Sequence, residues 1–140
     1  MSTIQSIARS LMIIHHRLAG RYGPLTRPQL RILSSLKKSK RTVSELAEYL
    51  QISSSGVTQA LDKLQIANYI VRQADPNDQR VVQISDTEMG RLALQEAERH
   101  YEYRVTELLQ TLSEEQQQTL SELLAELVYS KPMRNKKNEG

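Results

Sequence analysis

The spacing of apolar residues predicts that the first third of the chain is mainly helical. Apolar side chains return every three or four residues, as on one face of a helix, over 4–18, 25–36 and 43–50. Segments 26–29 (TRPQ) and 42–45 (TVSE) each have the Thr and the Gln or Glu of a capping box, which marks a helix start. We therefore expect a first helix that stops near the first glycine, and two further helices that begin at these boxes.

A further helix is predicted over 54–67, after a short connection. Ser53 is suited to cap its start, and Val57, Ala60, Leu61 and Leu64 form its apolar stripe. Two short helices joined by three or four residues have the outline of a helix-turn-helix motif.

The hydrophobic period then changes from that of a helix to that of a strand. Residues 69–72 and 80–84 are rich in residues that favour strands, and the segment 75–78 (DPND) between them is typical of a turn. Asn68 is suited to the left-handed conformation that ends a helix. These features predict a β-hairpin directly after the two helices, which is the arrangement of a winged helix-turn-helix.

The last third of the chain predicts two long helices. Apolar positions continue at helical spacing over 94–112, a third capping box (SEEQ) occupies 113–116, and a last amphipathic helix ends before Pro132. A single winged domain has too little surface to cover the apolar stripes of these helices and of the first helix. We therefore predict a two-fold dimer in which these helices pack against their counterparts.

The predicted fold is mostly α-helical with a small β-hairpin wing, in the α+β class. We expect a helical dimerisation region of residues 1–22 and 88–130, a winged helix-turn-helix domain of residues 24–87, and a basic flexible tail of residues 131–140.

Composition excludes several functional classes. The chain has 140 residues and no Cys, Phe or Trp. The absence of Cys excludes disulfides, thiolate metal sites and thiol nucleophiles. The longest early apolar run, at 11–14, is too short for a signal peptide or a membrane span, so we expect a cytoplasmic protein with no membrane partner. The net charge of +3 and the pI near 9.3 permit an anionic partner without requiring one.

Four stretches in order identify a family resemblance. They are Leu25-Thr26 with Gln29 and Leu33; 42–47 (TVSELA); 52–58 (ISSSGVT); and the turn 75–80 (DPNDQR) followed by 87–90 (TEMG). With them, the sequence resembles the MarR family of bacterial transcriptional regulators from about residue 4 to residue 130. It departs from the family pattern at Asn68, where Gly is common, at Gln79, where a basic residue is usual, and at Asp86, where an apolar residue is usual.

The resemblance implies a homodimeric transcriptional regulator, acting as a repressor, that binds a palindromic double-stranded DNA operator. The helix over 54–67 would enter a major groove, and the wing would contact the adjacent minor groove. Repression would follow from excluding the polymerase. A small phenolic or other aromatic ligand would release the DNA, as in many members of the family.

The candidate DNA-binding residues lie on the 54–67 helix and at the wing. Short hydroxyls approach phosphates, Gln reads adenine, Lys binds phosphate, and Arg is favoured in narrow minor grooves. The resemblance implies that the Asp-x-Arg pair of the wing forms the contact with the groove. The candidates are Ser53, Ser54, Ser55, Thr58, Gln59, Lys63, Asp78 and Arg80. The charge of Asp62 opposes phosphate, so we expect Asp62 to support the helix or the wing instead.

Other residues bear on functions besides DNA binding. His15, His16 and His100 lack metal-ligand spacing, so we predict no metal site and no cofactor. Tyr22, Tyr101 and Tyr103 fit a ligand cavity or plain packing, and we assign none of them to a ligand. No nucleophile–base pair or glycine-rich phosphate loop predicts an enzyme. The remaining alternative is a winged-helix module that binds protein and not DNA.

Overall fold

The computed structural model describes residues 1–130, so the predicted basic tail lies outside the described residues. The chain forms two compact units, Met1–Arg104 and a second unit that begins at Val105. No helix among the described residues combines the length and the apolar character needed to cross a membrane.

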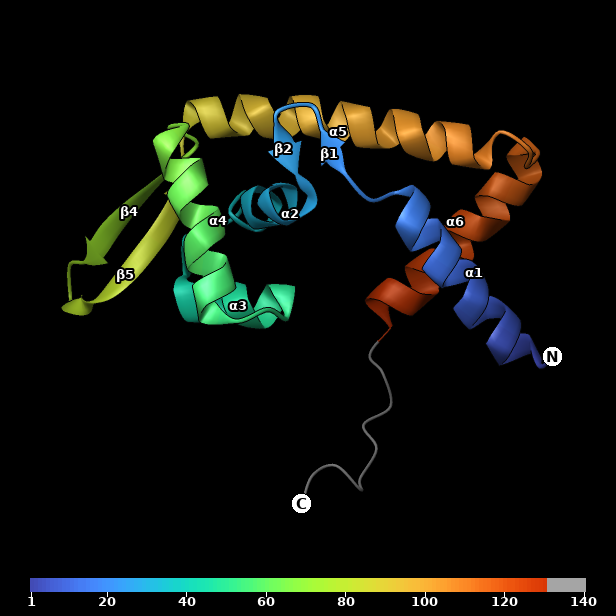
Figure 1. Cartoon of the computed structure of the whole chain (residues 1–140), viewed down its shortest axis with the longest axis horizontal. Helices are drawn as coiled ribbons and strands as arrows, with labels where there is room; N and C mark the ends of the chain where they lie inside the picture. Colours follow the sequence, from blue (N-terminus) through green and yellow to red (C-terminus); the bar gives the residue numbers. More distant parts are fainter. Residues whose placement is uncertain (131–140) are drawn as a thin grey trace, which may run out of the picture. The chain divides into compact units, whose positions relative to one another are not determined.

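The first unit contains most of the secondary structure (Figure 1). Its elements are α1 (Thr3–Arg17), β1 (Arg21–Tyr22), β2 (Leu25–Thr26), α2 (Arg27–Ser35), β3 (Arg41–Thr42), α3 (Val43–Leu50), α4 (Ser54–Ile66), β4 (Ile70–Asp75), β5 (Asp78–Asp86) and the greater part of α5 (Glu88–Leu109). Strands β1 and β2 pair with each other, and β3, β5 and β4 form an antiparallel sheet in that order. This is the α+β winged helix-turn-helix that the sequence predicts.

The predicted helix starts are confirmed by their capping hydrogen bonds. The Thr26 and Thr42 hydroxyls accept the backbone N–H groups of Gln29 and Glu45, and both side chains return the bond to the cap backbone. Ser53 caps α4 by accepting the N–H of Gly56 at 3.1 Å. These bonds satisfy N–H groups that have no partner within a helix.

The capping box that starts α1 was not predicted. Ser2 and Gln5 form it, and Ile4 of the apolar stripe lies between them.

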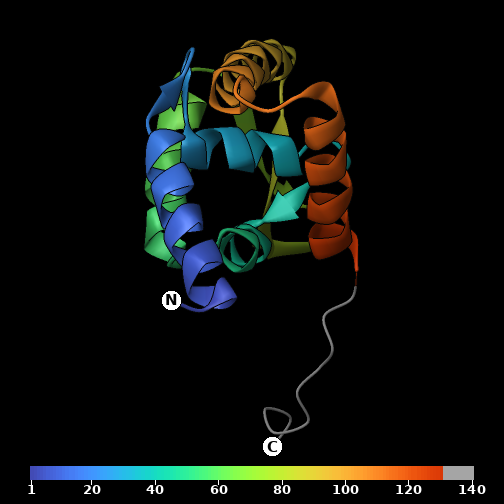
Figure 2. The same cartoon turned by 90° about the vertical axis from the view of Figure 1, so that its right-hand side faces the viewer.

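The core lies between the helices of the winged domain. Helices α2, α3 and α4 contact one another, as the two views in Figures 1 and 2 show. The stripe predicted on α4 is confirmed, since Val57, Leu61 and Leu64 are buried and Ala60 is partly buried. Ile70 and Ile84 add the wing strands to the same core. The unit therefore holds α4 by one face only, and the opposite face remains exposed.

The wing is a hairpin with a two-residue loop, as the turn signal predicts. Asp75 pairs with Asp78 across Pro76-Asn77, and the Asp75 carboxylate accepts the backbone N–H of Asn77 at 2.8 Å. The Asp75 carboxylate also accepts a bond from the Gln83 amide at 3.0 Å. These contacts fix the loop end of the hairpin, which extends away from α4 in Figure 1.

The junction between α4 and α5 depends on close backbone approach. Asn68 has the left-handed φ of 63° that the sequence predicts. The Thr87 hydroxyl donates to the Asn68 carbonyl at 2.6 Å and accepts the N–H of Gly90 at 3.0 Å. A Cβ at Gly90 would lie 2.1 Å from the carbonyl oxygen of Tyr69, so this position requires glycine. The segment 87–90 therefore fixes where α5 leaves the wing.

Two helices expose apolar faces within their own units. No residue of α1 is buried, and Ile4, Leu11 and Met12 are each more than half exposed. In the second unit, α6 (Glu114–Tyr129) begins at the predicted capping box of Ser113 and also has no buried residue. The exposed apolar side chains of α6 are Leu123, Leu124, Leu127, Val128 and Tyr129. Both helices therefore carry apolar surface that a partner would need to cover.

Candidate nucleic-acid interface

The exposed face of α4 carries all the predicted candidates of that helix. Its buried side chains face the core, while its polar side chains are exposed. The exposed set is Ser54, Ser55, Thr58, Gln59 and Lys63, together with the cap Ser53. The structure thus brings together six exposed polar side chains at the start and along one face of α4.

Two of these residues also have structural roles. The Ser53 hydroxyl serves as the N-cap of α4 and lies 3.3 Å from the Ser55 hydroxyl. The Thr58 hydroxyl donates to the Ser54 carbonyl at 2.9 Å, within the helix. The hydroxyls of Ser53 and Thr58 are therefore engaged in bonds within α4 and its cap.

The Asp-x-Arg pair predicted at the wing forms directly. Arg80 donates from Nε to Asp78 Oδ1 at 3.0 Å and from Nη2 to Oδ2 at 3.3 Å, and its backbone N–H also reaches Oδ1. These bonds from the Arg80 side chain and then its backbone hold the pKa of Asp78 below its ordinary value. The side chain of Arg80 is nevertheless 91% exposed.

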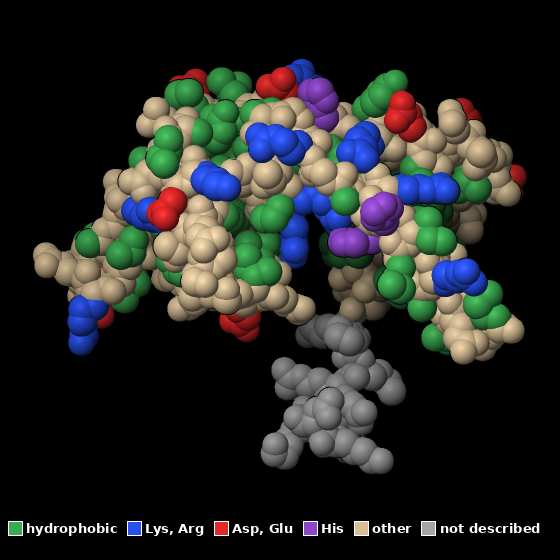
Figure 3. Space-filling view, viewed as in Figure 1, with side chains coloured by type: hydrophobic (Ala, Val, Ile, Leu, Met, Phe, Trp, Pro, Cys, Tyr) green, Lys and Arg blue, Asp and Glu red, His purple; other side chains and the backbone are tan. Residues whose placement is uncertain are grey.

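Arg80 therefore has a fixed direction and a free outer face. Figure 3 shows a basic side chain, with an acidic one beside it, at the loop end of the hairpin. An oriented and solvent-exposed guanidinium suits insertion into a groove of negative potential.

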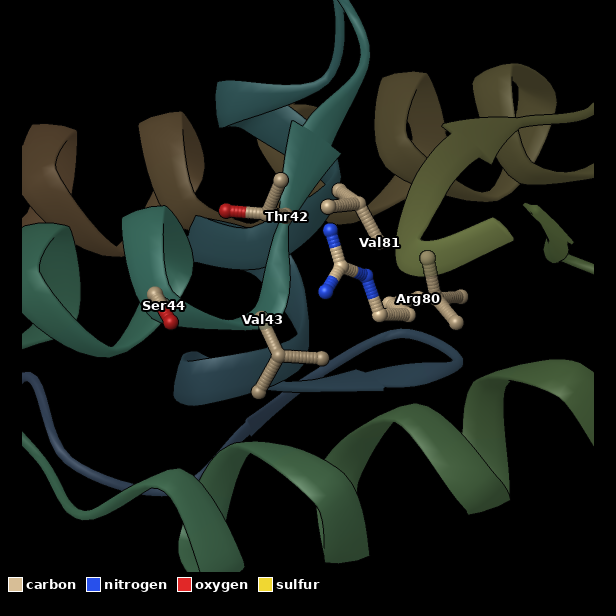
Figure 4. Close-up of a pocket in the computed structure, with 6 residues that line it drawn as sticks. Thr42, Val43, Ser44, Arg80 and Val81 are labelled. Carbon is tan, nitrogen blue, oxygen red and sulfur yellow. The ribbon is translucent and has the colours of Figure 1, made fainter. Parts of the chain in front are cut away.

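A shallow hollow of about 450 Å³ separates the wing from the start of α3. Arg80, Val81 and Val82 of β5 line one side, and Thr42, Val43 and Ser44 line the other. Figure 4 shows Arg80 reaching over this hollow toward the α3 end. The start of α3 and the wing thus border one continuous surface. Neither Thr42 nor Ser44 was among the candidate residues from the sequence.

A network that ties the wing to α4 was only partly predicted. Asp62 pairs with Arg72 of β4 at 2.9 Å, which confirms that Asp62 supports the wing. Arg72 also donates to the Gln65 side chain at 2.7 Å and to the Thr58 carbonyl at 3.4 Å. Arg72 was not a candidate, although its position two residues after buried Ile70 places it on the same side of β4.

The histidines do not come together. His15 lies 3.3 Å from an Arg27 nitrogen, and His100 lies 3.9 Å from Glu96. Across residues 1–130 the structure contains no group of three His, Asp or Glu side chains arranged to hold a metal ion.

The tyrosines divide between core and surface. Tyr22 is buried and meets Tyr101 edge to face, with ring centroids 5.1 Å apart. Its hydroxyl donates to the Leu18 carbonyl, and the Arg104 guanidinium lies over its ring. Tyr103 is 65% exposed. The first two tyrosines therefore join the C-terminal end of α1, β1 and α5, and they pack against each other.

Comparison with known proteins gives consistent matches. The model of the MarR family matches residues 24–81. The chain is 31% identical over 115 residues to the HTH-type transcriptional repressor MdtR of Bacillus subtilis, covering 81% of this chain and 74% of that protein. It is 36% identical over 106 residues to the transcriptional regulator ZitR of Lactococcus lactis, covering 74% of this chain and 73% of that protein.

A solved structure shares the architecture. The crystal structure of the YusO protein from Bacillus subtilis superposes with a TM-score of 0.67 at 28% identity, covering 94% of this chain and 100% of that one. The likeness therefore extends well beyond the helices and wing that the family model matches.

Proposed function

Since this chain belongs to the MarR family and is a DNA-binding transcriptional regulator, we propose that it acts in the bacterial cytoplasm as a homodimeric repressor of a palindromic operator. Each subunit would place the exposed face of α4 in a major groove and Arg80 in the adjacent minor groove. Excluding the polymerase from the promoter would then repress transcription.

One observation carries the proposed DNA contact. The polar face of α4 is exposed, and the wing beside it presents an oriented, 91% exposed arginine. Side chains at these two places can read base edges and groove shape, while Lys63 supplies a phosphate contact. A module that binds only protein would have no need for this pairing of polar helix and basic hairpin. Members of this family are transcriptional regulators and not enzymes, in line with the absence of a catalytic motif in the sequence.

The exposed apolar helices support the dimer. Ile4, Leu11 and Met12 on α1 and Leu124 and Leu127 on α6 present apolar surface to water. Burying such surface releases about 25 cal/mol per Å², which drives association. A two-fold dimer also fits palindromic DNA, because it presents two copies of α4 to half-sites about 34–36 Å apart.

A small hollow supports release by an aromatic ligand. It has a volume of about 260 Å³ and lies where His15 of α1 meets Arg27 and Arg31 of α2, with Pro28, Leu50 and Ile52 as apolar walls. Two arginines beside apolar walls suit a single-ring phenolate or aromatic carboxylate. A ligand there would contact both a proposed dimer helix and the winged domain, and so would shift the spacing of the two α4 helices.

Selection of genomic DNA tests the function. Purified protein is mixed with sheared genomic fragments of its source organism, and the retained fragments are sequenced. We expect enrichment of fragments that share one palindrome, with binding that weakens steeply as salt rises. Recovery of fragments with no shared sequence would contradict the function as an operator-specific regulator.

Sedimentation of the same sample tests the dimer. A mass of about 32 kDa, twice the 16.0 kDa of the chain, is expected at micromolar concentration. A folded monomer of 16.0 kDa that binds the palindrome as a single subunit would contradict the proposed dimer.

A further inference from the structure

Arg72 joins the two parts of the proposed interface. It belongs to β4, at the base of the wing, and its guanidinium contacts three acceptors that all belong to α4. Those acceptors are the Thr58 carbonyl, the Asp62 carboxylate and the Gln65 side chain. Positions 58, 62 and 65 are four and three residues apart, so they follow one side of the helix. One planar side chain therefore spans nearly two turns of α4.

Apolar packing fixes only the end of the wing that is far from its loop. Ile70 and Ile84 are buried, but beyond them toward the loop the strands carry no buried residue. Strand β3 pairs with β5 at only two positions, 41 and 42, and β4 is the edge of the sheet. Arg72 is the next residue after Ile70 on the same side of β4, and its side chain is only 26% exposed. Arg72 lies opposite Ile84 in the strand register, so its contacts add a polar hold on the wing where the apolar core ends.

We propose that Arg72 is a positioning residue that sets the angle between α4 and the wing, so that both fit adjacent grooves of one operator. The inference rests on the proposed DNA interface, and it adds a residue that does not itself need to touch DNA. The guanidinium is suited to this task because its donors lie in a fixed plane, whereas a lysine ammonium is a point charge on a flexible stem. Small errors in the placement of contacting groups weaken recognition strongly.

The variant Asp62→Asn distinguishes a positioning role of Arg72 from a simple effect of charge on DNA affinity. Asp62 is an acid on the DNA-facing helix, so removing its charge should strengthen DNA binding if only attraction to phosphate matters. Loss of its bond to Arg72 should instead weaken operator binding if the angle matters. We expect Asp62→Asn to bind the operator roughly ten-fold less tightly, with little change in affinity for unrelated DNA.

Arg72→Lys provides the complementary variant, since it keeps the positive charge but removes the planar fork. We expect a loss of operator affinity similar to that of Asp62→Asn. Hydroxyl-radical footprints of both variants should lose protection in the minor groove, where the wing contacts DNA, and keep protection in the major groove. A purely structural role would lower the melting temperature without changing the footprint at saturation.

Asp86→Asn serves as the matched control. Asp86 also pairs with an arginine of the same domain, Arg91 at 3.0 Å, but this pair joins β5 to α5 and not the wing to α4. We expect wild-type affinity and a wild-type footprint. Thermal unfolding of each variant confirms that it is folded, and the partial exposure of Asp62 and Arg72 makes both substitutions tolerable.

The outcomes distinguish a failure of the proposed function from a failure of the positioning role of Arg72. Wild-type protein that protects no DNA would overturn the proposed function and this inference together. Wild-type protein that protects a palindrome, while Asp62→Asn and Arg72→Lys match or exceed its affinity and keep the full footprint, would overturn the role of Arg72 and leave the proposed function intact. Reduced operator affinity in both variants, with selective loss of protection where the wing contacts DNA, would support the positioning role of Arg72.

Discussion

The Arg80 guanidinium folds back onto the Asp78 carboxylate two residues earlier on β5, with Nε 3.0 Å from Oδ1 and Nη2 3.3 Å from Oδ2. Asp78 thereby limits the directions that Arg80 can take, although Arg80 is almost fully exposed. An arginine oriented in this way loses less conformational entropy on entering a groove. This pair is the basis of the first two predictions.

Arg80→Ala should weaken operator binding without unfolding the protein. The side chain has little contact with the core, so the melting temperature should stay close to that of the wild type. Losing a groove contact should reduce operator affinity roughly ten- to a hundred-fold for each subunit. Fluorescence anisotropy on the selected palindrome measures the effect. Arg99→Ala, which removes an equally charged exposed residue of α5, is the control and should bind nearly as well as wild type. Equal affinities for Arg80→Ala and wild type would remove the wing from the mechanism.

The pKa of Asp78 should respond to the same substitution. Bonds from Arg80 hold this pKa below its ordinary value, so the contact is present above the ordinary carboxyl pKa and is lost only as the pH falls through the lowered value. Arg80→Ala should therefore raise the pKa of Asp78 back toward its ordinary value, while Arg99→Ala leaves it lowered. Carbon-13 NMR titration of the Asp78 carboxyl group measures both. An unchanged pKa in Arg80→Ala would show that the pair does not form in solution.

Lys63→Ala should act differently from Arg80→Ala. Lys63 is exposed on α4 and would meet phosphate, so its loss should weaken binding to operator and unrelated DNA by similar factors. The slope of log affinity against log salt should become shallower by about one unit for each subunit. Titrations at several salt concentrations measure this slope. A slope identical to that of wild type would place Lys63 away from the DNA.

Gly90→Ala should destabilise the whole domain. Its Cβ would meet the Tyr69 carbonyl at 2.1 Å, so either α5 or the chain after α4 must shift. We expect a loss of about 3 kcal/mol or more, which corresponds to a fall in melting temperature of roughly 10 °C. Gly56→Ala is the control, because its Cβ would meet only side chains, the nearest at 3.3 Å. Equal melting temperatures for the two variants would contradict the close approach.

The parts of the fold that were predicted depend on short-range signals. The caps at Thr42 and Ser53, the left-handed Asn68 and the turn between Asp75 and Asp78 all involve residues within a few positions of one another. Their hydrogen bonds follow from residue type and spacing alone, so a single sequence contains the information. The exposed face of α4 follows in the same way from the helical period.

Apart from the Ser2–Gln5 capping box, the parts that were not predicted depend on long-range pairing. Strand β3 has two residues, too few to show alternation, and it forms only because β5 lies beside it. The partners of Arg72 are 7 to 14 residues away on another element, so its role becomes visible only when β4 packs near α4. The division into dimerisation and winged regions, the DNA-contacting residues and the dimer itself stay predictions, since each concerns a second molecule.

In our proposal, α4 and the wing together recognise a specific operator. Anisotropy titration of the wild-type protein at physiological salt, on the selected palindrome and on a scrambled duplex of equal length and composition, tests it directly. We expect binding to the palindrome at least about 10³-fold tighter than to the scrambled duplex. Equal affinity for the two duplexes would contradict it.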